Sequence, residues 1–352
     1  MVIDLSFWKG KRVFLTGHTG FKGSWLSRIL SAAGAVVTGY SLPPPDVTNL
    51  YSICGLTDSI NSIFADIRDG KRLLTAFSNS GADIVIHMAA QPLVGDSYQR
   101  PQYTYEVNVM GTVNILECIR LAGGVKSFLN VTTDKVYHNN EWEWGYRESD
   151  PLDGYDPYSN SKSCSELITH SYKNSFFENH ETAISTARAG NVIGGGDFSI
   201  DRIVPDCFRA AMREEPIIIR NPLSVRPYQH VLEPLFAYLM ILQKQYEDAG
   251  YAGYFNIGPD EHDCITTGEL ATLFCEYWGR GLTWENHSVD GPHEANFLKL
   301  DCSRIKKQFN WKPHWTIHQA IKASIEWTLE YMGNGDIPGI MDKQIQSYRV
   351  TD

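Results

Sequence analysis

The fold is decided by the stretch KRVFLTGHTGFKG, residues 11–23. Its first six residues predict a short buried strand, Gly17, Gly20 and Gly23 predict a turn, and apolar residues at helical spacing follow as far as Ala33. A strand, a glycine turn and a helix in this order present a helix N-terminus to a pyrophosphate. The spacing Gly-x-x-Gly-x-x-Gly departs from the simplest dinucleotide motif, and a mere tight turn is the alternative interpretation. The contacts that we expect a dinucleotide to make here are with Gly17, His18, Gly20, Phe21, Lys22 and Gly23.

Strand and helix patterns alternate beyond this turn as far as Arg188. Buried-strand patterns at 35–40, 62–66, 83–87 and 128–131 are interspersed with segments of helical spacing. This alternation is typical of an α/β fold with a Rossmann-type, doubly wound parallel sheet, whose ligands bind at the carboxyl ends of the strands. We predict a nucleotide-binding domain over residues 1–190 and a smaller, mixed α/β substrate domain over 191–352, with some later segments returning to the first domain.

The position after the second strand pattern bears on the choice of cofactor. An acidic residue there would bind the 2′-hydroxyl of NAD, and an arginine would favour the 2′-phosphate of NADP. Tyr40 and Ser41 stand there, so neither signal is present, and the lack of a local basic residue favours NAD. Asp66 and Ile67, at the end of the third strand pattern, are expected to contact the adenine. Ala89 and Ala90, after the fourth, are small enough to allow close approach of the cofactor.

Tyr158 and Lys162 stand four residues apart at the start of a helical pattern, so they share one face. An ammonium about 4 Å from a phenol oxygen, at an effective dielectric near 20, favours the phenolate by roughly 4 kcal/mol, or about three pK units. That would lower the pKa of Tyr158 towards neutrality, where the phenolate can act as a general base on a sugar hydroxyl. With 18 tyrosines in the chain, about one such spacing arises by chance. The pair gains weight because it follows a nucleotide-binding turn in the expected order.

Composition excludes several classes of protein. The 352 residues carry a formal net charge of −10, which disfavours a nucleic-acid surface, because phosphate binding needs clustered lysine and arginine. The seven cysteines are scattered without a Cys-x-x-Cys pair, so we expect free thiols in a reducing compartment and no metal site. The N-terminus lacks the pattern of a signal peptide, and the longest apolar run, 235–242, predicts a buried helix too short to span a bilayer. We predict a cytoplasmic protein without a membrane span.

Together, these motifs resemble the extended short-chain dehydrogenase/reductases that modify nucleotide sugars, over nearly the whole chain. The resemblance depends on the glycine turn, Asp66-Ile67, His87-Met88-Ala89-Ala90, Asn108 with Gly111-Thr112, Tyr158 with Lys162, and Arg188-Ala189-Gly190-Asn191. It implies a Rossmann fold that binds NAD, with further cofactor contacts from Asn108, Thr132, Tyr158, Lys162 and Arg188. Because related enzymes pair two helices from each subunit, it also implies a homodimer or homotetramer formed through 101–121 and 158–176.

Thr133-Asp134-Lys135, at the end of the strand pattern 128–131, resembles the catalytic triplet of the nucleotide-sugar 4,6-dehydratases. The stretches 18–26, 188–197 and 226–234 narrow the resemblance to members that act on CDP-glucose. That subgroup carries lysine at the third position, where the enzymes acting on TDP-glucose carry glutamate. The resemblance therefore implies CDP-glucose as the substrate, bound in part by Thr133 and Asn191.

Three residues of the C-terminal half are further candidates for substrate binding. Arg202 and Arg226 are plausible bidentate anchors for a diphosphate in an acidic protein, although a lone arginine is more often a solvated surface charge. His293 could touch the substrate, or it could cap a loop.

A 4,6-dehydration begins with oxidation at C4, because the C5 hydrogen becomes acidic only beside a ketone. We expect Tyr158 to take the proton of the 4-hydroxyl while hydride passes to NAD, with Thr133 hydrogen-bonded to the same oxygen. Asp134 is the candidate acid for the departing O6, and Lys135 is the candidate base at C5 if its pKa is depressed. Hydride then returns to C6. The alternatives are a dehydratase or 4-epimerase acting on another nucleotide sugar, and a non-catalytic NAD sensor.

Overall fold

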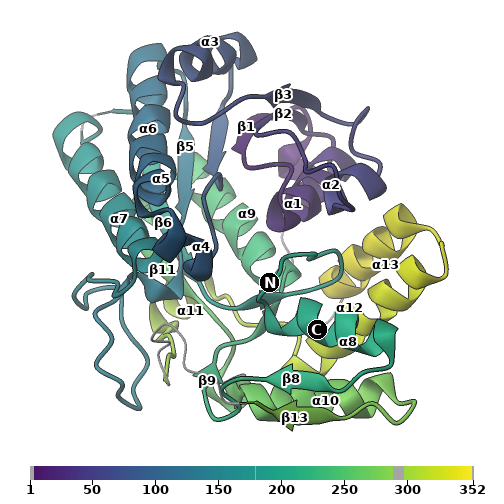
Figure 1. The fold of residues 1–352 in the computed structure, drawn as a ribbon. Coiled ribbons are helices and arrows are strands. Elements are labelled where there is room, and N and C mark those ends of the chain that lie inside the picture. The colour runs from purple at the N-terminus through teal and green to yellow at the C-terminus, as the bar shows by residue number, and fades with distance from the viewer. Residues whose placement is uncertain (1–3, 179, 288–296, 351–352) are drawn as a thin grey trace.

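The computed structural model describes residues 4–178, 180–287 and 297–350. At its centre lies a seven-stranded parallel sheet with the strand order β11-β6-β5-β4-β1-β2-β3 (Figure 1). Its strands are β1 (Arg12–Thr16), β2 (Val36–Ser41), β3 (Asn61–Phe64), β4 (Ile84–His87), β5 (Ser127–Val131), β6 (Ala183–Ala189) and β11 (Tyr254–Ile257). The order reverses at β1, which pairs with β2 on one side and with β4 on the other. The Rossmann-type, doubly wound sheet that we predicted is thus confirmed.

Helices cover both faces of this sheet (Figure 1). One core lies under α1 (Phe21–Ala32) and α9 (Leu232–Glu247), and the other lies under α3 (Gly70–Ser80) and α6 (Gly111–Ala122). Alternate residues of β1 point to opposite cores: Val13 and Leu15 to the first, Phe14 to the second. Strands buried on both faces have no solvent-facing side, which is why the segments of β1 and β4 are largely apolar in the sequence.

Segments from beyond residue 190 complete the N-terminal unit. Residues 232–242 of α9 are all buried, as expected for a helix that is apolar around its whole circumference. This confirms the buried helix predicted at 235–242. Strand β11 extends the sheet by pairing in parallel with β6. Of the helices that the structure describes, none is long and apolar enough to cross a bilayer.

The helical pattern after Pro101 contains an irregular turn that the sequence did not predict. Helix α5 (Pro101–Tyr105) passes into a π-helical turn (Glu106–Met110) before α6 begins. Asn108 lies in this turn, and its Nδ2 donates to Gln91 O at 3.1 Å and to Ser161 Oγ at 2.9 Å. A π turn of this length is a rare local departure inside a helix, so the helical spacing of apolar residues alone does not predict it.

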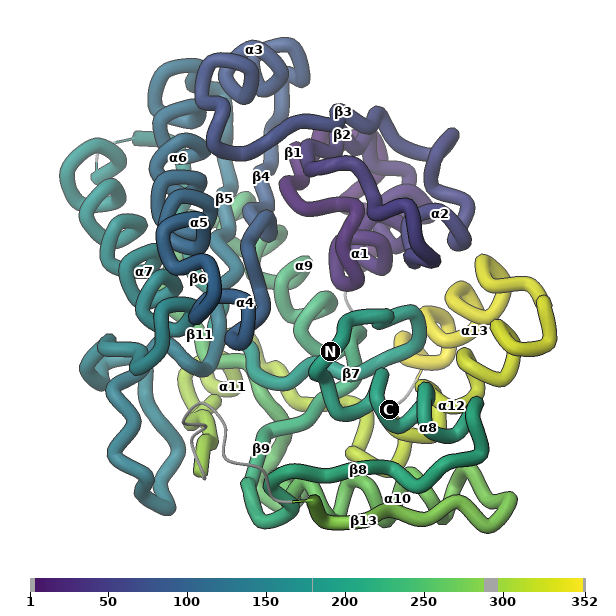
Figure 2. The backbone as a smooth tube through the Cα atoms, in the orientation of Figure 1, coloured from purple at the N-terminus to yellow at the C-terminus, as the bar shows by residue number. Residues whose placement is uncertain are grey.

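The C-terminal half forms a smaller mixed unit beside the sheet (Figure 2). Its apolar core lies between α8 (Ile203–Arg213), α10 (Thr267–Trp278), α12 (Ile317–Met332) and the parallel pair of β8 (Ile217–Ile219) and β13 (Trp284–Asn286). Shorter pairs join β7 (Val192–Ile193) to β10 (Gln229–His230) and β9 (Val225–Arg226) to β12 (Ile265–Thr266). The remaining α-helices are α2 (Leu50–Ile53), α4 (Val94–Gln99), α7 (Pro157–Phe176), α11 (Ser303–Phe309) and α13 (Ile337–Val350).

Candidate functional site

The glycine turn between β1 and α1 is shaped by three different steric demands. Gly17 has φ +79°, and a β-carbon on it would lie 2.8 Å from the backbone nitrogen of Ala89. A β-carbon on Gly23 would lie 2.7 Å from the Cα of His18, so this glycine lets α1 pack onto the turn. A β-carbon on Gly20 would meet, among the described residues, only Gly17 O at 3.4 Å. The N-terminus of α1 is therefore open to close approach by a pyrophosphate, as the motif requires.

The side chain of His18 is placed inside the protein, although we expected it at the cofactor. It is fully buried, its ring stacks on Phe64 with the centroids 6.1 Å apart, and a β-carbon on Gly39 would lie 2.6 Å from its Nδ1. Burial lowers the pKa of His18 to about 4, so the ring is neutral. The imidazole therefore packs the turn against β2, and only the backbone of His18 is available to a ligand there.

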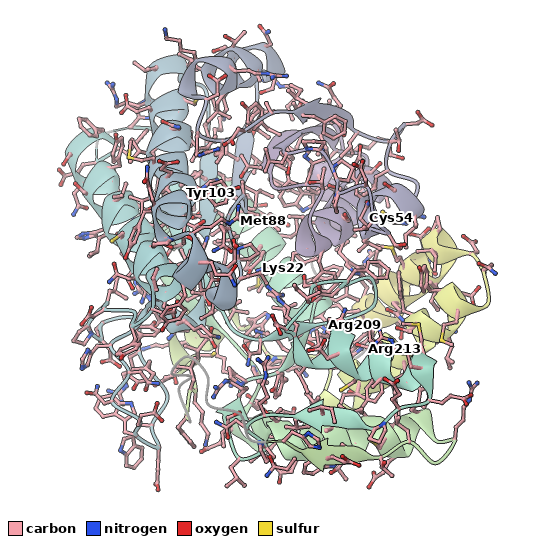
Figure 3. The ribbon with its side chains drawn as sticks, in the orientation of Figure 1. Lys22, Cys54, Met88, Tyr103, Arg209 and Arg213 are labelled. Carbon is pink, nitrogen blue, oxygen red and sulfur yellow. The ribbon has the colours of Figure 1, made fainter. Side chains whose placement is uncertain are left out.

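Lys22 lies on the first turn of α1, in the middle of the molecule (Figure 3). Its ammonium lies 6.0 Å from the centroid of the Tyr238 ring in α9. Burial lowers the pKa of Lys22 to about 7, with smaller contributions in the same direction from Lys162 and Arg202 and an opposing one from Asp134. Lys22 thus shares its electrostatic surroundings with Asp134 after β5, Lys162 on α7 and Arg202 before α8.

The end of β5 carries the predicted triplet on a short 3-10 turn, Asp134–Val136. Thr133 Oγ1 donates to Asp134 Oδ1 at 2.9 Å. Asp134 is fully buried, and its Oδ2 has no hydrogen-bond partner among the described residues. Lys135 Nζ lies 3.7 Å from Asp134 Oδ1 and donates to Asn191 Oδ1 at 3.4 Å. The turn thus holds an acid and an amine side by side, next to a residue that we expected to bind substrate.

Tyr158 opens α7, which is capped by Asp156, and its hydroxyl is close enough to Thr133 for that side chain to affect its pKa. Burial raises the pKa of Tyr158 to about 12, outweighing the opposite effects of Thr133 and Arg202. The lowered pKa that we expected for this phenol is therefore wrong for the structure as it stands, because desolvation of the phenolate dominates. Lys162 donates its Nζ to Val131 O at 3.2 Å, and burial lowers the pKa of Lys162 to about 8.

The expected adenine contacts lie at the end of β3. Asp66 accepts hydrogen bonds from Arg68, whose guanidinium also lowers the pKa of the Asp66 carboxyl. Ile67 is buried against α6, where a β-carbon on Gly111 would lie 2.9 Å from its Cγ2. Ala90 follows Ala89 after β4 and is partly buried. Their contacts with a cofactor stay predictions.

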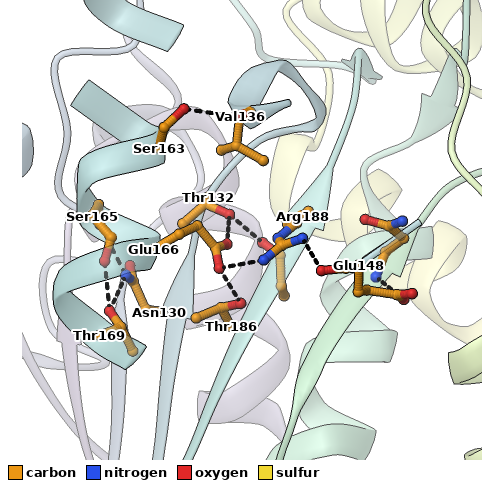
Figure 4. Close-up of polar contacts among 12 residues, drawn as sticks. Asn130, Thr132, Val136, Glu148, Ser163, Ser165, Glu166, Thr169, Thr186 and Arg188 are labelled. Carbon is orange, nitrogen blue, oxygen red and sulfur yellow. Dashed lines mark hydrogen bonds and ion pairs between the residues drawn. The ribbon is translucent and has the colours of Figure 1, made fainter. Parts of the chain in front are cut away.

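Three other expected cofactor contacts direct their side chains into the protein. Asn108 braces the segment after β4 through Gln91 and Ser161. Thr132 Oγ1 donates to Glu166 Oε1 at 2.5 Å, and Arg188 donates to Glu166 Oε2 at 2.9 Å (Figure 4). The Arg188 side chain is only 3% exposed, so the structure places its guanidinium in a buried ion pair and not in the open part of the site.

The predicted substrate-binding arginines differ in their surroundings. Arg202 precedes α8, pairs with Asp197 at 3.4 Å, and influences the pKa of both Lys22 and Tyr158. Arg226 lies on β9 and is 7% exposed, so it is not a solvated surface charge. His293 lies outside the described residues.

Two residues that shape the site were not predicted. Gly190 follows β6, and a β-carbon on it would collide with the unpartnered oxygen of Asp134. Glu166 stands four residues after Lys162 on α7, so helical spacing could have identified it, whereas a contact of Gly190 depends on how two distant strand ends meet.

Comparison with known proteins agrees with this geometry. The family model described as GDP-mannose 4,6 dehydratase matches residues 14–324. The CDP-glucose 4,6-dehydratase of Salmonella typhimurium is 45% identical over 353 residues, which cover 99% of this chain and 98% of that protein. The dTDP-D-glucose 4,6-dehydratase of Mus musculus is 27% identical over 327 residues, which cover 90% of this chain and 88% of that protein.

Solved structures share the fold. A UDP-glucose 4-epimerase from Thermotoga maritima superposes with a TM-score of 0.79 at 21% identity, covering 91% of this chain and 99% of its own. A dTDP-glucose 4,6-dehydratase from Streptomyces venezuelae, solved with NAD bound, gives a TM-score of 0.78 at 22% identity, covering 92% and 99%.

Substitution of Gly190 tests whether the site depends on the position of Asp134. In Gly190→Ala, the new methyl would lie 2.8 Å from Asp134 Cγ and 2.9 Å from Pro227 Cγ. We expect turnover of a nucleotide sugar to fall about 10²-fold, because a shift of roughly 1 Å in a catalytic group has that effect. Overpacking should also lower the free energy of unfolding by about 1–3 kcal/mol, measured by urea titration.

Gly95→Ala is the control, because within the described part of the chain nothing lies within 4 Å of the position that its new methyl would take. Full turnover by Gly190→Ala would contradict the prediction, because it would show that the reaction tolerates displacement of the Asp134 carboxyl.

Proposed function

The chain belongs to the GDP-mannose 4,6-dehydratase family, and from this premise we propose that it converts CDP-D-glucose to CDP-4-dehydro-6-deoxy-D-glucose and water. The observation that carries the proposal is the 45% identity to the Salmonella enzyme over 99% of this chain. Identity over that length includes both the catalytic strand end and the C-terminal half that would bind the nucleotide. Lys135 beside Asp134 supports the same choice, since the resemblance assigns lysine at this position to the enzymes that act on CDP-glucose.

We propose NAD as the cofactor. The open backbone at Gly20 and the N-terminus of α1 suit a pyrophosphate. At the end of β2, Thr19 Oγ1 and Ser41 Oγ are hydrogen-bonded at 2.8 Å, and Thr19 also donates to Leu42 O. Hydroxyls and a carbonyl suit the 2′-hydroxyl of NAD better than the phosphate of NADP. When bound, NAD supplies the acceptor of hydride from C4 and its donor to C6, so the reaction needs no outside oxidant.

In the oxidation step, Tyr158 takes the proton of the 4-hydroxyl. Burial disfavours its phenolate, so a positive charge must stabilise that form. Lys162, with a pKa of about 8, carries its ammonium at neutral pH, and a nicotinamide charge would add to it. Thr133, whose side chain affects the pKa of Tyr158, can hydrogen-bond the sugar oxygen that loses this proton.

In the elimination step, Asp134 and Lys135 divide the acid and base roles. Thr133 holds Asp134 Oδ1, which leaves Oδ2 to give its proton to the departing O6. Lys135 is 30% exposed and has a long flexible stem, so its amine is the group able to reach the C5 hydrogen. O6 departs as water. C6 then receives hydride and C5 receives a solvent proton, so the reaction balances.

The function is tested by incubating the purified protein with CDP-, TDP-, UDP- and GDP-hexoses in turn, with and without added NAD. We expect the NMR signals of a 4-keto-6-deoxy sugar from CDP-glucose and not from the other nucleotides. Product from a different nucleotide would overturn the base preference, and a 4-epimer would overturn the reaction.

The two roles in elimination are separated by isotope incorporation in D2O. Asp134→Asn should lower turnover about 10²- to 10⁴-fold, because the leaving O6 loses its proton donor. Lys135→Ala should slow entry of deuterium at C5 to a similar extent. The control is Lys71→Ala, which removes an exposed lysine of α3. Deuterium entering C5 at the wild-type rate in Lys135→Ala would exclude lysine as the base.

We also propose that two copies pair through the face formed by α6 and α7. Four apolar side chains on or beside these helices are about half exposed, namely Met110 (49%), Leu121 (57%), Leu167 (53%) and Phe176 (52%). Leu167→Glu would bury an unpaired charge in that interface, so light scattering should detect monomers in place of dimers or tetramers. Leu223→Glu is the control, because Leu223 is 81% exposed in the C-terminal half. An unchanged mass for Leu167→Glu would rule out this face.

A further inference from the structure

Glu166 occupies the turn of α7 that follows Lys162, and it is 1% exposed (Figure 4). Its Oε1 accepts from Thr132 Oγ1 at 2.5 Å, and its Oε2 accepts from Thr186 Oγ1 at 2.7 Å and from Arg188 Nη2 at 2.9 Å. One carboxylate therefore joins α7 to the ends of both β5 and β6.

Two consecutive residues at the end of β5 are each held by a side chain of α7. Lys162 Nζ donates to the carbonyl of Val131, and Glu166 accepts from the hydroxyl of Thr132. Thr133 comes next in the chain, and its side chain affects the pKa of Tyr158. A displacement of Glu166 would therefore reach the surroundings of Tyr158 through three consecutive residues, of which Val131 ends β5 and Thr132 and Thr133 follow it.

The charges around Lys162 give Glu166 a second role. Lys22 faces Lys162 from α1, and His87 faces Lys162 from β4. Burial lowers the pKa of His87 to about 3, so its imidazole is neutral. Burial also lowers the pKa of Lys162, and Glu166 opposes this effect. Asp134, from the turn after β5, interacts with Lys22 in the same space.

The groups that face Glu166 itself are Arg188 and Tyr254, with Tyr137 bonded to the far side of Arg188. Arg188 Nη1 donates to Tyr137 and to Glu148 O, so its position does not depend on Glu166 alone. The competing explanation is therefore that Glu166 is buried only to form a structural ion pair with Arg188.

We propose that Glu166 is a positioning residue of the catalytic pair: four residues after Lys162 on α7, it locks the end of β5 to that helix and supplies the negative charge that the lysine faces. The inference rests on the proposed function only in taking Tyr158 and Lys162 as the catalytic pair. It adds a carboxylate that touches neither substrate nor cofactor but controls both the place and the charge of the lysine.

The direct test is titration of Lys162 by NMR in protein labelled with ¹³C-lysine, its signal assigned with Lys162→Arg. Glu166→Gln removes the negative charge but keeps the shape, so the ammonium of Lys162 should be lost about one pH unit lower than in the wild type. Glu166→Asp keeps the charge and should titrate near the wild type. Titration of Lys162 at the same pH in all three would overturn the proposal.

The functional consequence is measured as the pH profile of kcat/KM on the nucleotide sugar that the wild type turns over. Because the active form needs the ammonium, the alkaline limb should move about one pH unit lower in Glu166→Gln, a tenfold loss above about pH 8, and stay in place in Glu166→Asp. No turnover by the wild type would count against the proposed function, whereas the NMR titration decides the role of Glu166 without substrate.

Two variants separate this role from stability. Glu233→Gln, in α9, alters another buried carboxylate that accepts from His314, Trp315 and Tyr348, and it should leave the titration of Lys162 unchanged. If Glu166→Gln fails to fold beside Arg188, the double variant Glu166→Gln/Arg188→Met removes both buried charges. We expect Lys162 to titrate about one pH unit lower in this double variant as well. A wild-type titration of Lys162 in that variant would leave Glu166 as a structural partner only.

Discussion

Burial of charged groups at the end of β5 is the constraint on which the site depends. Lys162, Asp134, Glu166 and Arg188 are each 5% exposed or less. A charge removed from water is tolerated only when hydrogen bonds and opposite charges surround it. Glu166 with its three donors meets that requirement completely, and Lys162 meets it through a backbone carbonyl. Asp134, with one oxygen unpartnered among the described residues, is the member left free for chemistry.

Steric constraints at glycines bring the rest of the site up to that strand end. Gly17 lets the segment after β4 pass, Gly23 lets α1 sit on its turn, and Gly190 lets the chain after β6 run against Asp134. The atoms that a side chain would displace are backbone at Gly17 and Gly23, and a buried carboxyl with a proline ring at Gly190. Two strand ends, one helix N-terminus and the start of α7 can therefore converge on one space.

Local pattern was enough to predict which residues share that space. The alternation of strand and helix patterns predicted the parallel sheet, and a spacing of four predicted that Tyr158 and Lys162 share a face of α7, as they do. The direction of the side chains was less predictable. His18 and Arg188 both lie inside motifs that resemble cofactor-binding ones, yet the imidazole packs against Gly39 and the guanidinium pairs with Glu166. Those contacts join residues far apart in sequence, which no local spacing records.

The sequence by itself determined the α/β architecture, the order of nucleotide turn and catalytic pair, and the family, because these depend on periodicity and on residue types at short spacing. The tertiary structure alone decided the electrostatics. Spacing predicted that Lys162 would lower the pKa of Tyr158, whereas burial raises it to about 12. Desolvation is the sum of what every surrounding element removes from contact with water, so it exists only once the sheet, α1 and α9 have closed around the pair.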